Sequence, residues 1–254
     1  MPQGVERGSG DRGNRGGAGR DRPGRPARRA GPAAVERPVF DEDVPWVPKR
    51  VMADLRASSA AHHLDDLRRA MGAAEAAVDA GEYGAAVKAL GWAKSVAPKS
   101  WAVREAFGIA LYLSGDFHRA QSELQAYRRL TGRQDQNHLL ADCARASERW
   151  AKVDEYVEAM RGGNVHGDRI AEGVIVQAGS RADRGDLAGA LRVLESFADT
   201  GAGVEPWHLR VWATAADLAE QYGDAERAAD YYRAIVSLTG DEDVAARLAE
   251  LEGD

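Results

Sequence analysis

Apolar residues recur at helical spacing along most of this 254-residue chain. In the segment WAVREAFGIALYL, which starts at Trp101, residues Val103, Phe107, Ala110 and Leu111 fall at the i, i+4, i+7 and i+8 positions of one helix face. Only two prolines follow residue 51, and Ala, Leu, Glu and Arg dominate there. No stretch of useful length alternates apolar and polar residues with the period of two that is typical of a β-strand. We therefore predict an all-helical body over residues 51–254.

The first 34 residues have a different composition. They hold nine Gly, four Pro and eight Arg, with Met1 as the only large apolar side chain. Such a segment cannot bury enough apolar surface to offset the entropy of ordering its backbone. Residues 1–34 are therefore predicted to be a disordered Arg/Gly-rich tail.

Residues 35–50 lie between the tail and the helical body, and their three prolines exclude a helix interior. Two interpretations remain open for this segment. It is an extended strap whose Phe40 or Trp46 docks onto the body, or it is a linker with two incidental aromatic residues.

Charge and cysteine content narrow the class of protein. Residues 1–50 hold 11 Arg and Lys against 7 acidic residues, so the net charge of −6 combines a basic head with a body of net charge −10. The single Cys143 excludes an internal disulfide and a cysteine-based zinc finger, which favours a reducing compartment. No apolar run has the length of a membrane helix or a signal peptide. We expect a cytoplasmic protein without a membrane partner.

A short motif, Gly-acid-x-x-x-Ala, recurs along the body. It begins at Gly81, Gly115, Gly185 and Gly223, and a degenerate copy without the glycine begins at Glu148. Successive copies lie 34, 33, 37 and 38 residues apart. A fixed period of this length indicates stacked helical hairpins.

The period and its small residues resemble those of tetratricopeptide (TPR) repeats. With the turn glycine at position 15, positions 8 and 20, which are small in TPR units, hold Ala or Gly in nine cases of ten, and position 24 is larger. The residues at positions 8, 20 and 24 are Ala74, Ala86, Leu90; Gly108, Ala120, Leu124; Ala141, Val153, Val157; Ala178, Ala190, Leu194; Ala216, Ala228, Tyr232. The resemblance covers residues 67–252 and implies about five TPR-like hairpins, with Asp243–Glu252 as a capping helix.

Two further features refine this resemblance. The run from Val103 to Ala146 is similar to actinobacterial TPR-type proteins that also carry an Arg/Gly-rich head. The third unit lacks its turn glycine, and the Gly-rich stretch 160–168 is expected to be a long surface connection that breaks the period.

Candidate catalytic groups are sparse. His62 and His63 precede two aspartates but lack a third histidine or cysteine ligand, so we expect a solvated helix end and no metal site. The other four histidines are isolated and are interpreted as surface or capping residues, whereas Cys143 is interpreted as a small buried side chain. Without a phosphate-binding glycine motif, the sequence predicts neither an enzyme nor a cofactor.

The resemblance implies a binding groove along the first helix of each hairpin, at repeat positions 2, 5, 9 and 12. In the first two units these positions hold Arg68, Met71, Glu75, Val78, Ala102, Glu105, Ile109 and Tyr112. The residues predicted to bind a peptide or protein partner are Glu105, Tyr112, His138, Asp142, Arg145, Arg210 and Asp217. This interpretation makes the chain a non-enzymatic interaction scaffold.

An alternative function rests on the tail. Its arginines resemble those of RNA-associated Arg/Gly segments, in which guanidinium groups pair with phosphates. They are Arg7, Arg12, Arg15, Arg20, Arg22, Arg25, Arg28 and Arg29. In this alternative the repeats recruit a protein partner. Since the tail has no aromatic residue and three acidic ones, we expect at most weak RNA contact, and a solubilising tail or one that folds back on the acidic body remains an equal alternative.

Overall fold

The computed structural model describes residues 35–40, 45–198, 200–201 and 203–253. Within these ranges the chain forms twelve α-helices, one short 3₁₀-helix and no strand. The helices are α1 (Lys49–Ser58), η1 (Ala61–His63), α2 (Leu64–Asp79), α3 (Tyr83–Val96), α4 (Trp101–Leu113), α5 (Phe117–Thr131), α6 (Asn137–Arg145), α7 (Trp150–Arg161), α8 (Gly167–Ala182), α9 (Leu187–Ala198), α10 (His208–Tyr222), α11 (Ala225–Thr239) and α12 (Glu242–Gly253). The predicted tail, residues 1–34, lies outside the described residues.

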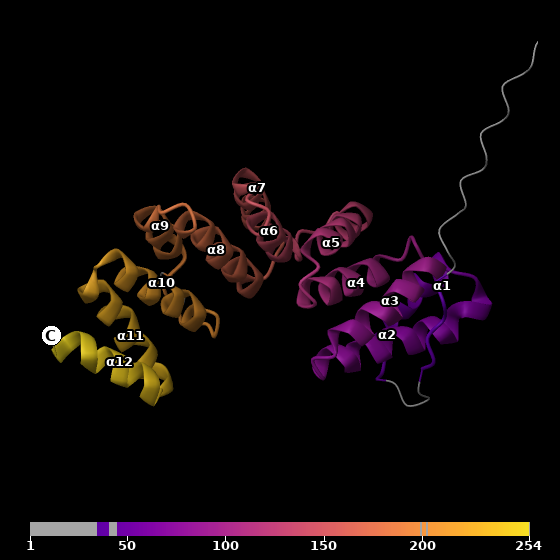
Figure 1. The fold of residues 1–254 in the computed structure, drawn as a ribbon, viewed down its shortest axis with the longest axis horizontal. Helices are drawn as coiled ribbons and strands as arrows, with labels where there is room; N and C mark the ends of the chain where they lie inside the picture. The colour runs from indigo at the N-terminus through magenta and orange to yellow at the C-terminus, as the bar shows by residue number, and fades with distance from the viewer. Residues whose placement is uncertain (1–34, 41–44, 199, 202, 254) are drawn as a thin grey trace, which may run out of the picture. The chain divides into compact units, whose positions relative to one another are not determined.

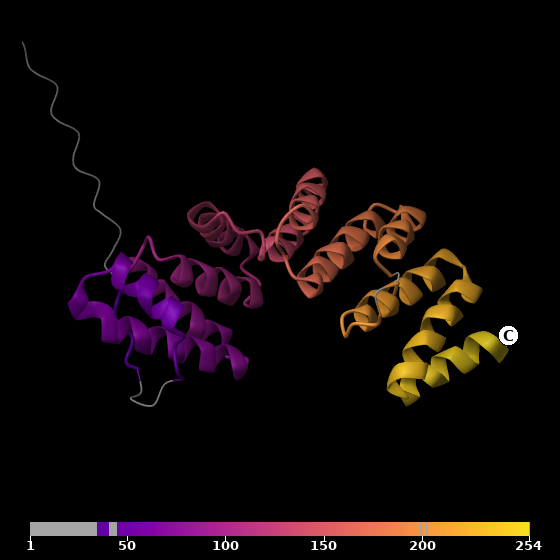
Figure 2. The same ribbon diagram turned by 180° about the vertical axis from the view of Figure 1, so that it is seen from behind.

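Helices α2 to α11 form five helical hairpins, and each packs on the next in chain order (Figure 1). Helices α2, α4, α6, α8 and α10 are the first helices of these hairpins. Helix α12 packs on α11 at the C-terminal end, and the reverse view shows the same succession (Figure 2). The predicted all-α solenoid of about five repeats with a C-terminal capping helix is confirmed for the described part of the chain.

The Gly-acid motif forms the turn inside four of the five hairpins. Its glycines adopt the left-handed conformation, with φ of +73° at Gly81, +82° at Gly115, +79° at Gly185 and +87° at Gly223. The acidic residue has a second role that the repeat pattern did not reveal. The side chains of Asp116, Asp186 and Asp224 accept hydrogen bonds from backbone N–H groups three residues later, and so cap the second helix.

The third hairpin makes its turn without glycine. Glu148 takes its place and adopts φ of +54°, the only positive φ of a non-glycine residue in the described part. A left-handed conformation costs an L-residue about 1–2 kcal/mol, because Cβ approaches the following carbonyl oxygen. Tertiary packing of the hairpin therefore imposes a turn that the local sequence disfavours.

Small residues allow the two helices of a hairpin to approach closely. A Cβ built on Gly108 would lie 2.7 Å from the side chain of Leu124, which shows how tightly α4 packs on α5. All ten residues at repeat positions 8 and 20, and all five at position 24, are buried. The packing pattern implied by the repeat alignment is thus present in every hairpin.

The connection expected at 160–168 is shorter than predicted. Helix α7 continues through Met160 to Arg161 and α8 begins at Gly167, so only residues 162–166, which include Gly162 and Gly163, form the connection. A longer connection follows α9, where residues 199–207 separate it from α10. The irregular period arises from this connection and from unequal first helices, since α6 is 9 residues long and α8 is 16.

Residues before the first hairpin pack onto it. Phe40 is half-buried, with its ring centroid 5.8 Å from that of Trp92 on α3, whereas Trp46 is 72% exposed. Helix α1 buries Leu55 completely. The carboxylate of its Asp54 accepts hydrogen bonds from the Ser100 hydroxyl and from the backbone N–H of Ala102. This helix, which begins two residues before the predicted body, covers the N-terminal end of the solenoid.

The apolar core is divided between the second and third hairpins. Most of the buried residues from α1 to α5 form two clusters, and most of those from α6 to α11 form a third. Two apolar side chains cross the boundary, since Leu124 of α5 belongs to the third cluster and Cys143 of α6 to one of the first two. Polar contacts cross the boundary on the side of the second helices: Gln125 donates to the Tyr156 hydroxyl at 3.1 Å, and the Arg128 guanidinium lies 5.6 Å from the Tyr156 ring centroid.

Candidate functional site

All seven residues predicted to line the groove lie on first helices. Glu105 and Tyr112 are on α4, His138, Asp142 and Arg145 on α6, and Arg210 and Asp217 on α10. The structure also shows what each side chain contacts. Most of them bond to another residue of the solenoid.

Two hydrogen bonds join α4 to the third hairpin. The Gln136 side chain donates to Glu105 at 2.8 Å, and the Tyr112 hydroxyl donates to Asp142 at 2.7 Å. Burial, followed by the hydrogen bond to Asp142, raises the pKa of Tyr112 well above its ordinary value. The phenol therefore remains a neutral donor across the physiological range.

Arg145 joins α6 to the end of α8. Its guanidinium bonds to the Asp183 carboxylate at 2.7 and 3.0 Å, and this bond lowers the pKa of Asp183. The guanidinium also covers Gly179, where an added Cβ would lie 2.6 Å from it. Repeat position 9 of the fourth hairpin is consequently closed to a ligand by the chain itself.

The remaining two residues on α10 are also bonded. Arg210 bonds to Glu172 of α8 at 2.6 Å, and Asp217 accepts a hydrogen bond from Tyr232 of α11 at 3.1 Å. We use the name polar ladder for the bonds between successive first helices and their ends. The pairs of the polar ladder are Glu105–Gln136, Tyr112–Asp142, Arg145–Asp183 and Glu172–Arg210.

His138 corrects the interpretation of the histidines as surface or capping residues. It is only 8% exposed, with Nε2 3.4 Å from an Arg169 nitrogen and Nδ1 buried without a hydrogen-bond partner in the described part. Burial and the Arg169 charge lower the pKa of His138 to about 4. His208 is also buried, at 2% exposure, so the surface interpretation is wrong for both residues. A helical histidine next to apolar neighbours was the available signal.

The first two hairpins present a different surface at the same repeat positions. A hollow of about 280 Å³ opens between the start of α1 and the first helices α2 and α4. We call it the N-terminal hollow. Its lining residues are Val47, Pro48, Val51, Met71, Ala74, Glu75, Val78, Asp79, Leu90, Ala106 and Ile109. Four of these, Met71, Glu75, Val78 and Ile109, occupy expected groove positions, whereas Ala102 at position 2 is buried and faces no groove.

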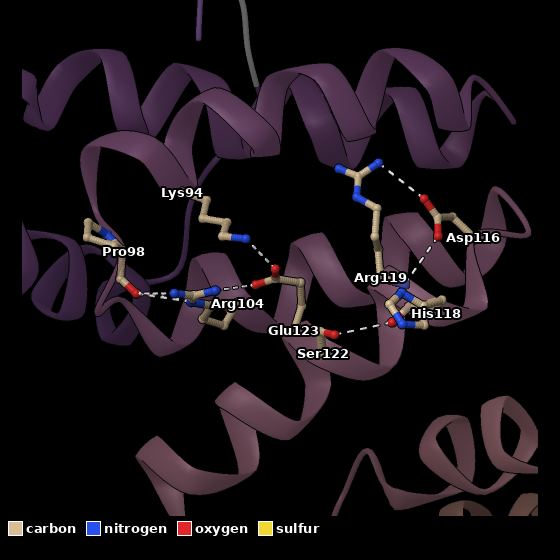
Figure 3. A network of polar contacts seen from close by, with 8 residues as sticks. All are labelled: Lys94, Pro98, Arg104, Asp116, His118, Arg119, Ser122 and Glu123. Atoms are coloured by element: carbon tan, nitrogen blue, oxygen red, sulfur yellow. Dashed lines mark hydrogen bonds and ion pairs between the residues drawn. The ribbon is translucent and has the colours of Figure 1, made fainter. Parts of the chain in front are cut away.

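A buried carboxylate, which no sequence pattern singled out, links the first hairpin to the second. Glu123 of α5 is 5% exposed and lies between the cations of Lys94 on α3 and Arg104 on α4 (Figure 3). Arg104 also donates to the Pro98 carbonyl at 2.8 and 3.0 Å. These contacts fix the geometry of the two hairpins around the hollow.

No catalytic constellation is visible in the described residues. Cys143 is buried, as predicted, and burial raises the pKa of its thiol to about 12, so no thiolate is available as a nucleophile. Over the described ranges, no three His, Cys, Asp or Glu side chains are grouped to hold a metal ion. None of the helices described is both long and apolar enough to cross a membrane. The tail arginines lie outside the described residues.

Comparison with known proteins identifies the fold. No protein-family profile matches the chain, and no curated protein matches it in sequence. Solved structures similar to it include two TPR-type proteins. One, from Podosopora anserina with nearly identical TPR-like repeats, is 17% identical, covers 76% of this chain and 99% of its own, and has a TM-score of 0.56. The other is a thermophilic TPR protein of Thermus thermophilus, at 14% identity, 73% and 98% coverage and a TM-score of 0.53. The described body is thus a TPR-like helical-hairpin solenoid.

Proposed function

We propose that this protein is a non-enzymatic interaction scaffold that binds a peptide segment of another protein along its first helices. The observation that carries the proposal is the N-terminal hollow, an open apolar surface at the repeat positions where the TPR resemblance places ligand contacts. Apolar surface left open on a folded chain marks a binding site more often than it marks defective packing.

The polar ladder supports the same proposal in a different way. Its bonds join α4 to the third hairpin, α6 to the end of α8, and α8 to α10, so the first helices are held in a fixed arrangement before a ligand arrives. A preformed surface lowers the entropy cost of binding. In this proposal the ladder residues support the groove, and they contact the ligand only where their remaining polar atoms face it.

Peptide selection with the full-length protein tests this function. A display library of random twelve-residue peptides is selected against the immobilised chain, and enriched peptides are resynthesised with a benzophenone group for photo-crosslinking. We expect crosslinks on the first helices α2, α4, α6, α8 and α10. A selection that enriches no peptide, or crosslinks confined to the second helices, contradicts the proposal.

A further inference from the structure

The N-terminal hollow has the size of a site for one side chain. Its volume of about 280 Å³ lies just below the range of roughly 300–1,000 Å³ that is typical of small-molecule and cofactor pockets. The half-buried side chains of Met71, Val78 and Ile109 supply apolar walls, and Leu90 closes the base. An aliphatic or aromatic anchor fits this lining, because apolar anchors in small pockets provide much of the affinity of protein interfaces.

Two carboxylates stand at the rim of the hollow. Glu75 and Asp79 are both exposed and lie four residues apart on α2, so they share one helix face. Like charges at this spacing destabilise a helix slightly. Neither has an ion-pair partner among the residues that the structure describes, whereas Glu172, Asp183 and Glu220 farther along the solenoid are each paired with an arginine. The rim therefore attracts a cation.

We propose that the N-terminal hollow binds a peptide of a partner protein that carries a large apolar residue beside a lysine or arginine. The apolar side chain enters between α2 and α4, and the neighbouring cation pairs with Glu75 and Asp79. The inference rests on the proposed scaffold function and adds the chemistry of the ligand. The chain's own tail fits this site poorly, because it offers cations but only Met1 as a large apolar anchor.

Residues at the start of α1 and just before it complete the site. Val47 is buried and, together with Pro48 and Val51, forms the wall opposite the first helices. Upstream of this wall, Arg37 pairs with Asp66 of α2 at 2.5 Å, and Phe40 packs on Trp92. Residues outside the repeats thus give the hollow a wall that the repeat pattern alone does not provide.

Variants of the full-length protein test the ligand chemistry in the same peptide selection. The wild type is expected to enrich peptides with a large apolar residue next to Lys or Arg. Glu75→Lys with Asp79→Lys reverses the rim charge, so the enriched flanking residue should change to Asp or Glu. Ala106→Trp fills the hollow and should weaken binding of the selected peptides at least tenfold, with Ile109→Ser as a second variant should the tryptophan prevent folding. Glu226→Lys, an exposed charge reversal on α11, is the matched control and should leave the selection unchanged.

Several outcomes would overturn the inference while leaving the scaffold function intact. Enriched peptides without an apolar-basic pair would do so, as would peptides whose binding is unaffected by Ala106→Trp and by the charge reversal. Displacement of the selected peptides by a synthetic copy of residues 1–34 would assign the hollow to the tail. A wild-type dimer that Ala106→Trp converts to a monomer in sedimentation velocity would assign it to a second copy. Failure of the wild type to enrich any peptide would instead contradict the scaffold function itself.

Discussion

Val78 of the first hairpin and Arg145 of the third occupy the same repeat position with different results. Val78 leaves its side chain at the open N-terminal hollow, whereas Arg145 covers Gly179 and pairs with Asp183. Position 9 differs in the same way, since Glu75 has no ion-pair partner in the described part while Asp142 accepts a hydrogen bond from Tyr112. One repeat position can thus serve either contact with a ligand or contact between hairpins.

The largest expected effect concerns the buried ion pairs that join the first two hairpins, which carry the N-terminal hollow. Glu123→Ala leaves Lys94 and Arg104 without their buried counter-charge, and breaking a buried ion pair costs about 3 kcal/mol. Urea unfolding followed by circular dichroism should show this loss in the free energy of unfolding. Glu226→Ala, which removes an exposed carboxylate, is the control and should change it by less than about 0.5 kcal/mol. Equal values for the two variants would show that the buried contacts do not stabilise the first two hairpins.

Acid should weaken the third hairpin, where His138 is buried among the residues of the polar ladder. Because burial and the Arg169 charge lower the pKa of His138 to about 4, below its unfolded value of 6.5, the unfolded chain binds an extra proton between these pH values. This contribution to stability is therefore complete above pH 6.5 and falls as the pH drops toward 4, with a loss of about 2.5 kcal/mol by pH 4.5. Asp135 and Asp168 oppose the shift. Urea titrations at pH 7.0 and 4.5 should give a smaller difference for His138→Gln, and an unchanged difference would exclude this residue as the cause.

Substitutions at two glycines test how closely the helices of the first two hairpins approach one another. Gly108→Ala places a methyl group 2.7 Å from Leu124 and should cost about 1.5 kcal/mol. Gly91→Ala is the matched control, because its methyl group meets Phe107 at an ordinary 3.7 Å and the alanine favours the helix. Thermal melts should thus lower Tm for the first variant and hold or raise it for the second. A shift of the same sign in both would contradict the packing argument.

The smallest effect sharpens the comparison at the turn of the third hairpin. Glu148→Gly removes the strain of φ at +54° and should stabilise the protein by about 0.5 kcal/mol, since part of the gain is lost to the greater freedom of glycine in the unfolded chain. Gly115→Ala imposes a similar strain on the second hairpin and should destabilise it by about 1 kcal/mol. Chemical denaturation of both variants gives the comparison, and destabilisation by Glu148→Gly would contradict the strain argument.

The sequence predicts the hairpins well because each depends on local signals. Gly81, Gly115, Gly185 and Gly223 mark turns that need a left-handed residue, and buried small residues recur one period apart. The connection predicted at 160–168 is present but shorter, at 162–166, because Met160 and Arg161 end α7 and Gly167 and Asp168 begin α8.

The candidate site was harder to predict, because its contacts join residues of different hairpins. Tyr112 and Asp142 are 30 residues apart, and Arg145 and Asp183 are 38 apart. The repeat alignment places these residues on first helices but does not show whether they bond to one another or face solvent. The hollow also needs Val47 and Pro48, which precede the first repeat and therefore lie outside any pattern that the repeats define.

The division of the apolar core between the second and third hairpins has a consequence for how the protein opens. Most members of each cluster lie on one side of this boundary, and the contacts that cross it are few: the apolar side chains of Leu124 and Cys143 and the polar contacts of Gln125 and Arg128 with Tyr156. Such a molecule should unfold in two cooperative units, with amide hydrogens of α2 to α5 exchanging with solvent at a different rate from those of α8 to α11. A peptide bound in the hollow would then slow exchange in the first unit while leaving the second nearly unchanged.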